Sequence, residues 1–261
     1  MANTSIYRTI TSAGSLTTWT FSAWVKRADL WDTNKVLIMN RNTAASSETK
    51  IQFNMTNEAI QFYQDYSSTV SNQVTSSYYR DTGAWYHIVV VWDTTNGPPA
   101  DRFRLWVNGV RVTEFSTSSN PGSSAGSALL QTASPAILAI GKQPVGDTEY
   151  FDGEMSHVIL TDGYAYDAST FGEFDATSGI WKIKTSPSVT YGTNGFFLKM
   201  EDRTNLDLDS SSNAHTFTTG GTLTATYDNP SNNFATFNPL HNTGAVMSNG
   251  NTTAQSNDAN F

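Results

Sequence analysis

The pair Glu173 and Asp175 has the spacing in this sequence that comes nearest to a catalytic arrangement. Side chains two residues apart on a β-strand point to one face, and retaining glycoside hydrolases need two carboxyl groups about 5 Å apart across the scissile bond. Glucanases built on a β-sandwich often supply these groups as Glu-x-Asp-x-x-Glu. Ser178 replaces the last glutamate of that pattern, and its hydroxyl cannot act as a general acid at neutral pH. The sequence therefore predicts no catalytic residue and no enzyme.

The residues around this pair are typical of a connection between strands. Gly172 and Gly179 flank the pair, and Asp167 or Ser169 could cap a helix of one or two turns. We therefore interpret residues 167–175 as a short helix followed by a structural turn.

Other polar groups within the predicted strands are weaker candidates for chemistry. Asp152 and Glu154 share one strand face, but no further carboxylate follows within reach on that face. We expect both to be solvent-facing residues at a sheet edge. His87 and His157 are expected to be hydrogen-bonded residues of a sheet rather than ligands or bases.

Calcium is the one cofactor that the sequence leaves open, and no motif requires it. Residues 207–213 begin like a calcium loop but lack the glycine and the final glutamate that such a loop needs. A polar turn is the simpler interpretation. Asp147, Glu149 and Asp152 surround the start of a strand and could hold calcium, without a spacing that compels it. We predict no metal site.

Glycan binding needs aromatic faces together with a few fixed polar groups. Several aromatic residues stand next to polar or loop-like sequence and are candidates for such contacts: Trp31, Tyr63, Tyr66, Tyr164 and Tyr166. Packing at the rim or in the core is the alternative interpretation for each of them.

The elements that must position these residues are β-strands, because the apolar pattern has a period of two almost throughout. Residues 19–26 alternate as in a half-buried antiparallel strand, and residues 85–93 are apolar on both faces, as in a central strand. Asn108-Gly109 between β-rich flanks predicts a two-residue type I′ hairpin, which places Trp106 opposite Arg111. Roughly a dozen short strands indicate an all-β sandwich or barrel.

The composition of the chain argues against several classes of function. The chain has 261 residues, a net charge of −8 and no cysteine. An acidic chain without a basic run is a poor nucleic-acid binder, and the absence of cysteine removes disulfides and cysteine-based zinc sites. The N-terminus has no signal-peptide pattern, and no apolar run is long enough for membrane insertion.

Several motifs resemble those of laminin-G-like, concanavalin A-type jelly rolls in their order: WTFSAWVKR, WYHIVVVWDTT, FRLWVNGVRV, AIGK and FDGEMSHVILTDG. A further set is similar to laminin-G-like structural proteins of marine tailed bacteriophages: TSAGSLTTWTFSAWVKR, FGEFDATSGIWK, YGTNGFFLKMED, LDSSSNAHTF and DNPSNNFATFNPL. The resemblance implies a two-sheet antiparallel jelly-roll sandwich. The segment at 209–217 normally comes first in laminin-G-like chains, so its late position suggests a circular permutation, which a sandwich tolerates.

The resemblance also implies the organisation and the role of the chain. We expect a laminin-G-like domain at 1–228 and an extended arm or linker at 229–261, where Asn-rich sequence replaces the alternation. The arm would contact neighbouring subunits through Phe234, Phe237, Leu240 and Phe261. The expected function is a non-enzymatic virion protein, a capsid decoration, fibre or tail appendage, made in the host cytoplasm without a signal peptide. Its expected partners are other virion proteins and copies of itself, with host-surface glycans as further ligands. The alternatives are a soluble glycan-binding adsorption module and, least favoured, a glycan hydrolase.

Overall fold

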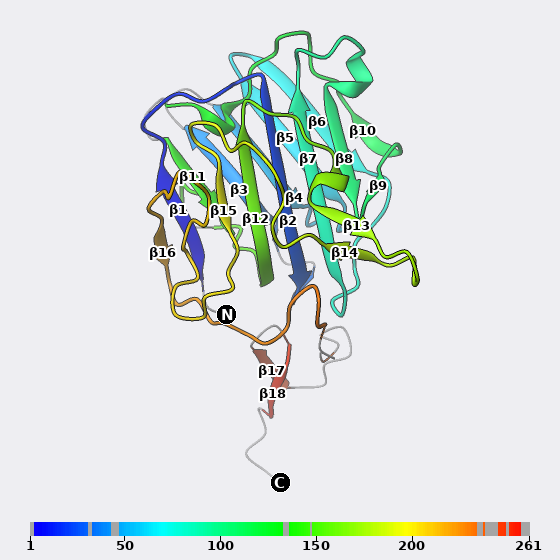
Figure 1. Ribbon diagram of the computed structural model, residues 1–261, viewed down its shortest axis with the longest axis vertical. Helices are drawn as coiled ribbons and strands as arrows, with labels where there is room; N and C mark the ends of the chain where they lie inside the picture. The colour runs from blue at the N-terminus through cyan, green and yellow to red at the C-terminus, as the bar shows by residue number, and fades with distance from the viewer. Residues whose placement is uncertain are drawn as a thin grey trace.

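The protein is an all-β sandwich, as the sequence predicts, in the computed structural model drawn in Figure 1. Two large antiparallel sheets face each other, and two small hairpins lie outside them. The structure describes residues 3–30, 33–42, 47–132, 136–146, 148–233, 237, 245–248 and 251–256.

The six-stranded sheet is built around β2 and β7. Its order is β15 (Phe196–Leu198), β12 (Gly153–Asp162), β2 (Thr18–Arg27), β7 (Trp85–Asp93), β8 (Phe103–Val107) and β9 (Val110–Arg111). The interpretation of residues 85–93 as a central strand is confirmed, since β7 has a neighbour on each side.

The eight-stranded sheet lies opposite. Its order is β10 (Phe115–Ser118), β6 (Thr69–Thr75), β5 (Ile60–Tyr66), β4 (Ser47–Phe53), β3 (Lys35–Asn42), β11 (Ile137–Ile140), β1 (Ser5–Thr9) and β16 (Thr218–Gly220). The pattern of period two in residues 215–228 predicts a longer strand than β16, which ends at Gly220-Gly221. Gly221 has φ +73° and lies against the backbone of Asn3, where a Cβ would not fit.

The main core fills the space between the two sheets with the inward residues of each strand. Trp19 stacks on Trp92 with ring centroids 6.4 Å apart, and Phe62 of the opposite sheet lies 5.5 Å from Trp92 and 4.8 Å from Phe103. These four rings are almost fully buried. Because burying a large apolar side chain stabilises a fold by about 1.5–3 kcal/mol, this aromatic cluster is a major link between the sheets.

The predicted hairpin between β8 and β9 is confirmed. Asn108 and Gly109 both have positive φ, at +48° and +78°, as a type I′ turn requires. Trp106 pairs with Arg111 and Val107 pairs with Val110 in the expected register. The Arg111 guanidinium donates to Asp101 at 2.6 Å.

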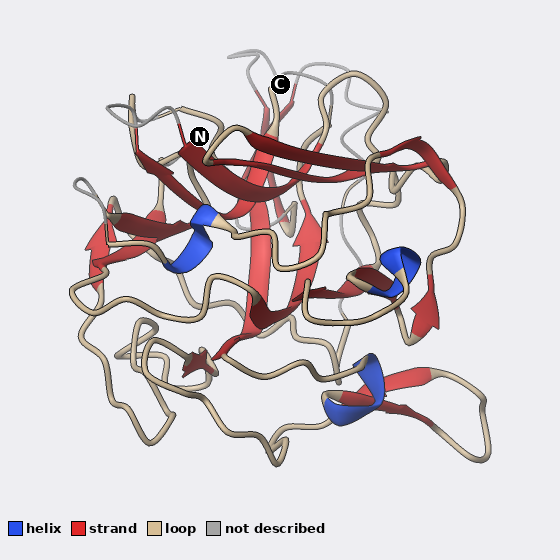
Figure 2. Ribbon diagram, turned by 90° about the horizontal axis from the view of Figure 1, so that it is seen from above, coloured by secondary structure: helices blue, strands red, loops and turns tan. Residues whose placement is uncertain are grey.

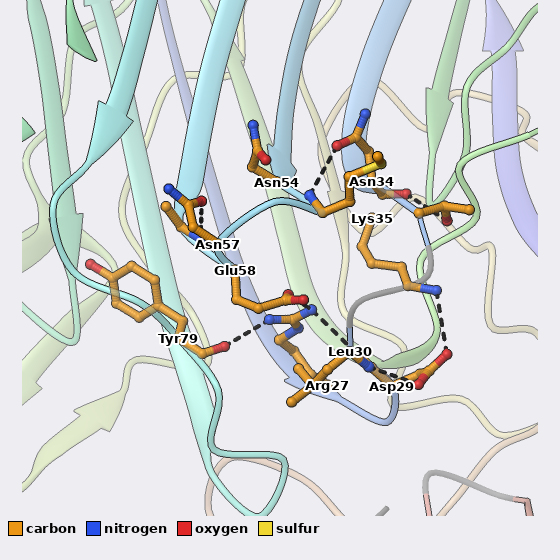
Figure 3. Close-up of polar contacts among 12 residues, drawn as sticks. Arg27, Asp29, Leu30, Asn34, Lys35, Asn54, Asn57, Glu58 and Tyr79 are labelled. Atoms are coloured by element: carbon orange, nitrogen blue, oxygen red, sulfur yellow. Dashed lines mark hydrogen bonds and ion pairs between the residues drawn. The ribbon is translucent and has the colours of Figure 1, made fainter. Parts of the chain in front are cut away.

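A buried ion pair closes the lower end of the sandwich, as Figure 3 shows. Arg27 at the end of β2 donates to Glu58 in the turn before β5 and to the carbonyl oxygen of Tyr79 at 2.7 Å. Its guanidinium also lies over the ring of Phe53, 4.3 Å from the centroid. The pair therefore joins the six-stranded sheet to the eight-stranded sheet. Removing one partner would leave the other charge buried without compensation.

The strand β2 differs from the half-buried strand that alternation predicts, because its residues are buried on both faces. The segment that follows β12 supplies the cover. It contains the 3-10 helix η3 (Ala168–Thr170) and the hairpin of β13 (Gly172–Phe174) and β14 (Trp181–Ile183). Figure 2 shows this helix and hairpin as a separate layer outside the sheet. A second apolar cluster forms between the layers, with Val89, Val91 and Phe171 at its centre.

The described part of the C-terminal segment contains the hairpin of β17 (Ala245–Ser248) and β18 (Thr253–Ser256). Asn233 donates to the carbonyl oxygen of Gly83 at 2.9 Å, and Asn251 donates to that of Ala28 at 2.7 Å. These bonds join the segment to its own sandwich. Of the predicted arm contacts, Phe237 is half exposed, whereas three lie outside the described residues: Phe234, Leu240 and Phe261.

Candidate functional site

The carboxylate pair at 173–175 belongs to a hairpin, so the interpretation as a plain turn is wrong. Glu173 on β13 pairs with Lys182 on β14. The Lys182 ammonium lies 3.3 Å from Glu173 and 3.3 Å from Asp175. Hydrogen bonds from the backbone and hydroxyl of Ser178 and from the backbone of Thr177 lower the pKa of Asp175 to about 2. A carboxyl group with that pKa holds no proton to donate at neutral pH, and both carboxylates serve the hairpin. The predicted short helix before it is confirmed, since Asp167 caps η3 through Ser169.

Trp181 anchors the hairpin of β13 and β14 to the six-stranded sheet. Its indole nitrogen donates to Nδ1 of His87 at 2.9 Å, and its ring lies against Gly109 and Gly172, where any Cβ would overlap it. Two glycines far apart in the sequence therefore make room for one ring.

His87 is a hydrogen-bonded residue of the sheet, as predicted. Since Nδ1 accepts from Trp181, Nε2 carries the hydrogen and donates to the hydroxyl of Ser22 at 2.9 Å. Trp24 stacks on the imidazole with centroids 4.7 Å apart. Burial, with His157 as a second and smaller cause, lowers the pKa of His87 to about 3. The ring is neutral at pH 7 and serves to hold the outer layer.

The eight-stranded sheet presents a polar groove on the outer face of β4 and β5. Its volume is about 340 Å³, and its walls carry Lys50, Gln52, Gln61, Tyr63 and neighbouring residues up to Asn34. Tyr63 lines the groove from β5, and its cross-strand neighbours are Lys50 on β4 and Asn72 on β6. The Lys50 ammonium lies 5.6 Å from the Tyr63 ring centroid.

A row of amide side chains crosses the three strands beside this ring. Gln52 and Asn54 donate to Gln61 at 2.8 and 3.0 Å, and Gln61 donates to Asn72 at 2.9 Å. The Gln52 carbonyl oxygen is buried and has no hydrogen-bond partner. Since the amides hold one another in place, the groove offers fixed donors and acceptors at low entropic cost.

The lower end of the groove is held by the network in Figure 3. Asn34 donates to Glu149 at 2.9 Å and accepts from the backbone of Met55 at 3.1 Å. The turn that carries Asn54 and Met55 is thereby joined to the neighbouring loops.

Charged groups line the other end. Glu48 on β4 and Asp65 on β5 are direct cross-strand partners. One oxygen of Glu48 lies 3.3 Å from Arg41 and the other lies 3.6 Å from Lys50. Burial first, and then the charges of Asp65 and Glu48, raise the pKa of Tyr63. Its phenol therefore stays protonated and can donate a hydrogen bond at neutral pH.

The five aromatic residues predicted to bind glycans do not lie together. Tyr63 lies in the groove, whereas Tyr66 falls on the inward side of β5 by alternation, against Gly126. Tyr164 and Tyr166 stack on each other at 6.1 Å in the outer layer over the six-stranded sheet. Trp31 lies outside the described residues.

The sequence analysis did not predict the amide row, although the alternation of polar residues in two neighbouring segments indicates it. The segments KIQFNM (50–55) and AIQFYQ (59–64) have the period-two pattern of strands, with Lys50, Gln52, Gln61 and Tyr63 on the polar side. Their pairing places Gln52 opposite Gln61 and Lys50 opposite Tyr63. Comparing the polar faces of adjacent predicted strands would have indicated the groove.

Within the described ranges, no three histidine or acidic residues are placed to hold a metal ion. Asp147, one of the residues considered for calcium, lies outside those ranges. The segment 207–213 forms a polar turn, in which Asp209 accepts from the backbone of Phe197 and Ser211. No helix among the described residues is long and apolar enough to cross a membrane.

A family model described as the concanavalin A-like lectin/glucanases superfamily matches residues 3–165. The chain belongs to this superfamily. The match spans β1 to β12 and hence most strands of both large sheets, including the whole groove. No curated protein sequence matches the chain.

Solved structures similar to this superfamily member share little sequence with it. A pentraxin from Limulus polyphemus matches at 15% identity and TM-score 0.40, covering 60% of this chain and 69% of its own. Domain 4 of an arabinanase from Geobacillus stearothermophilus, in complex with arabinotriose, matches at 18% and 0.41, covering 58% and 64%. Tailspike protein 2 of an Escherichia coli O157:H7 bacteriophage matches at 10% and 0.43, covering 63% and 22%. The match thus spans less than two thirds of the arabinanase domain and of the tailspike.

Proposed function

We propose that the chain is a non-enzymatic structural protein of a bacteriophage virion that displays a lectin-like sandwich, and that its polar groove contacts host-surface glycans. The observation that supports this most is the groove itself, where Tyr63 and an amide row stand on the part of the eight-stranded sheet formed by β4, β5 and β6. Members of the superfamily include lectins by its description.

The chemistry of the groove suits a sugar. A sugar ring has an apolar face that packs on an aromatic ring and hydroxyl groups that both donate and accept hydrogen bonds. Tyr63 offers the ring, and the amides of Gln61 and Asn72 offer both kinds of partner.

A glycan hydrolase is the second candidate, because Glu48 and Asp65 stand opposite each other in this groove region. Retaining hydrolysis needs one carboxyl group to deliver a proton to the leaving oxygen. Ion pairs with Arg41 and Lys50 occupy both oxygens of Glu48, which favours a binding role. Incubation with laminarin, agar and alginate tests this directly. Release of reducing sugar that disappears in Glu48→Gln or Asp65→Asn would replace the binding proposal by the hydrolytic one.

The virion role rests on the resemblance to phage structural proteins and on an uncharged polar composition, with only 15% charged residues. Quantitative mass spectrometry of purified virions tests it. A constant copy number in every particle, repeated on a symmetric site, is the expected result. Absence from washed particles would refute the structural role while leaving a soluble glycan-binding module in place.

The C-terminal segment 229–261 is proposed to act as an assembly arm toward neighbouring subunits. Its few aliphatic residues cannot form a core, since ordering each residue costs about 1–2 kcal/mol. The bonds from Asn233 and Asn251 join described parts of this segment to its own sandwich, so the assembly role would be carried by the segment from that position. We predict that deletion of residues 229–261 leaves a folded sandwich with the circular dichroism of the full chain but lowers incorporation into particles several-fold. Normal incorporation of the deletion variant would contradict the arm role.

A further inference from the structure

Two side chains near the C-terminal segment attach it to the six-stranded sheet. They belong to residues 222–233, orange in Figure 1, which cross the lower end of this sheet as a strap. Asp228 accepts hydrogen bonds from the Lys26 ammonium at 2.6 Å and from the indole nitrogen of Trp85 at 2.8 Å. Asn233 accepts a further bond from Lys26 at 2.7 Å. Lys26 and Trp85 therefore form the seat of the strap.

Glu154 is the third member of this row of side chains. It lies on β12 and Trp85 lies on β7, and both are direct cross-strand partners of Lys26 on β2. The prediction that Glu154 faces solvent is wrong, because both of its carboxyl oxygens are buried. The strap causes this burial, since Thr226 and Asp228 lie beside the carboxyl group. A second buried carboxyl group thus lies next to the ion pair of Lys26 and Asp228.

The charges of this cluster balance only while Glu154 holds a proton. The side chains of Lys26 and Asp228 are 2% and 1% exposed, and as an ion pair they are neutral together. Ionised Glu154 would add a buried negative charge beside Asp228, which is unfavourable in a site of low polarity. Burial first, together with the charge of Asp228, raises the pKa of Glu154 to about 7, against the opposing effects of Thr226 and Lys26.

The other charged groups around the strap act elsewhere. Arg203 donates to the backbone carbonyl oxygens of Ala225 and Thr226 at 3.2 and 3.0 Å, so it holds the strap by its main chain. Arg27, next to Lys26, donates to Glu58. The pKa of Glu154 responds to Asp228 and Lys26 rather than to the further titratable groups that line the cavity of about 890 Å³ at this end: Asp29, Asp152, His157 and Glu201.

We propose that Glu154 is a pH-dependent lock for the strap. Its protonated form leaves the pair of Lys26 and Asp228 undisturbed, and its ionisation places a second negative charge beside Asp228 and favours release of the strap from the sheet. Release would free the start of the segment 229–261. The use of the lock in assembly rests on the arm role proposed above, whereas the lock itself does not.

The direction of the pH dependence follows from where the proton is bound. With the strap in place, the pKa of Glu154 is about 7, and once the strap has left, the carboxyl group meets water and returns to its ordinary value of 4.5. The closed form therefore holds one proton more between these two values. The equilibrium constant for release should rise roughly tenfold per pH unit in this window and level off above about pH 7. The strap is held most firmly below about pH 4.5.

Hydrogen exchange of the Trp85 indole N–H tests the lock, because this hydrogen is donated to Asp228 and is freed when the strap leaves. The exchange rate is measured by NMR on the full chain and compared with that of free tryptophan at the same pH, which gives a protection factor. We expect this factor to fall roughly tenfold per pH unit between about pH 5 and about pH 7. A constant factor over this range would overturn the proposal.

Substitution of Glu154 shows whether this group causes the pH dependence. Glu154→Gln keeps the shape of the neutral carboxyl group and should give a protection factor that no longer changes with pH. The matched control is Glu173→Gln, which removes a carboxylate from the exposed β13–β14 hairpin and should keep the dependence of the wild type. An equally steep dependence in Glu154→Gln and the wild type would refute the role of Glu154.

A second variant covers the case in which Glu154→Gln does not fold. Asp228→Asn keeps an oxygen that accepts from Trp85 but removes the negative charge beside Glu154, so that ionised Glu154 can balance Lys26. The pH dependence should again disappear. If it persists at full steepness, the two carboxyl groups do not act together and the lock is wrong.

Low concentrations of urea separate release of the strap from unfolding of the whole domain. A local opening exposes little surface, so exchange through it should not depend on urea below the unfolding transition. A steep dependence would mean that the Trp85 hydrogen exchanges only in the unfolded state and would contradict a local lock. All these measurements use the isolated protein, so they can fail independently of the arm role, which the deletion of residues 229–261 tests in particles.

Discussion

The outer faces of the two sheets differ in what lies over them. On the six-stranded sheet, Trp24, His87 and Val89 lie beneath the hairpin anchored by Trp181 and are buried. On the eight-stranded sheet, Lys50 and Tyr63 remain partly exposed and line a groove. One face thus serves stability, and the other is available for recognition.

The difference teaches that the side chains of a sheet face decide whether the face needs a covering segment. The covered face carries apolar side chains at its centre, such as Val91 and Phe197, which need a partner layer. The open region has the amide row, whose polar groups satisfy one another without a cover.

The strongest test of this contrast is to truncate the central aromatic residue of each face. Trp181→Ala removes the ring over His87, Gly109 and Gly172 and should lower the free energy of unfolding by about 3–5 kcal/mol. Tyr63→Ala, on the open face, should lower it by less than about 1 kcal/mol. Urea denaturation of the two variants measures both. Equal losses would mean that the two faces do not differ in this way.

A smaller loss is expected from Gly109→Val, which acts on the covered face through the backbone. Gly109 has φ +78°, and a Cβ there meets the Trp181 ring, so strain and overlap together should cost about 3 kcal/mol. Gly97→Val is the matched control, because no atom lies within 4 Å of its Cβ position. Thermal unfolding compares them. An unchanged melting temperature for Gly109→Val would contradict both the turn and the packing of Trp181.

The covered face should also be the more sensitive to acid. Burial holds the pKa of His87 at about 3, below the unfolded value of about 6.5, so the unfolded state binds more protons between these values. Its contribution is complete above about pH 6.5 and should fall by roughly 2–3 kcal/mol by about pH 4.5. His87→Gln should flatten this part of the curve of unfolding free energy against pH. A curve of the same slope in wild type and variant would show that His87 is not the group responsible.

The sequence predicts those features of the fold that depend on neighbouring residues. The turn at Asn108-Gly109 follows from local φ preferences, and the central position of β7 follows from its apolar residues on both faces. The hairpin at 172–183 could not be predicted in this way, because Trp181 finds its place against Gly109, which is distant in the sequence.

The candidate sites were harder to predict for the same physical reason. Tyr63 becomes part of a groove only when β4 and β5 pair in one register. Glu154 becomes buried only when Thr226 and Asp228 arrive from the far end of the chain. Both depend on contacts between segments that no local pattern records.

Glycan binding by matched tyrosine variants tests the central claim, that the open face is the recognition surface, most directly. The wild type is first screened on an array of bacterial surface polysaccharides, and its dissociation constant for the best ligand is measured by titration calorimetry. Tyr63→Ala should bind roughly tenfold more weakly or worse, as expected for a central aromatic contact, while Tyr164→Ala, on the exposed covering segment, should bind as the wild type does. Unchanged binding by Tyr63→Ala, or no glycan binding at all, would contradict the account.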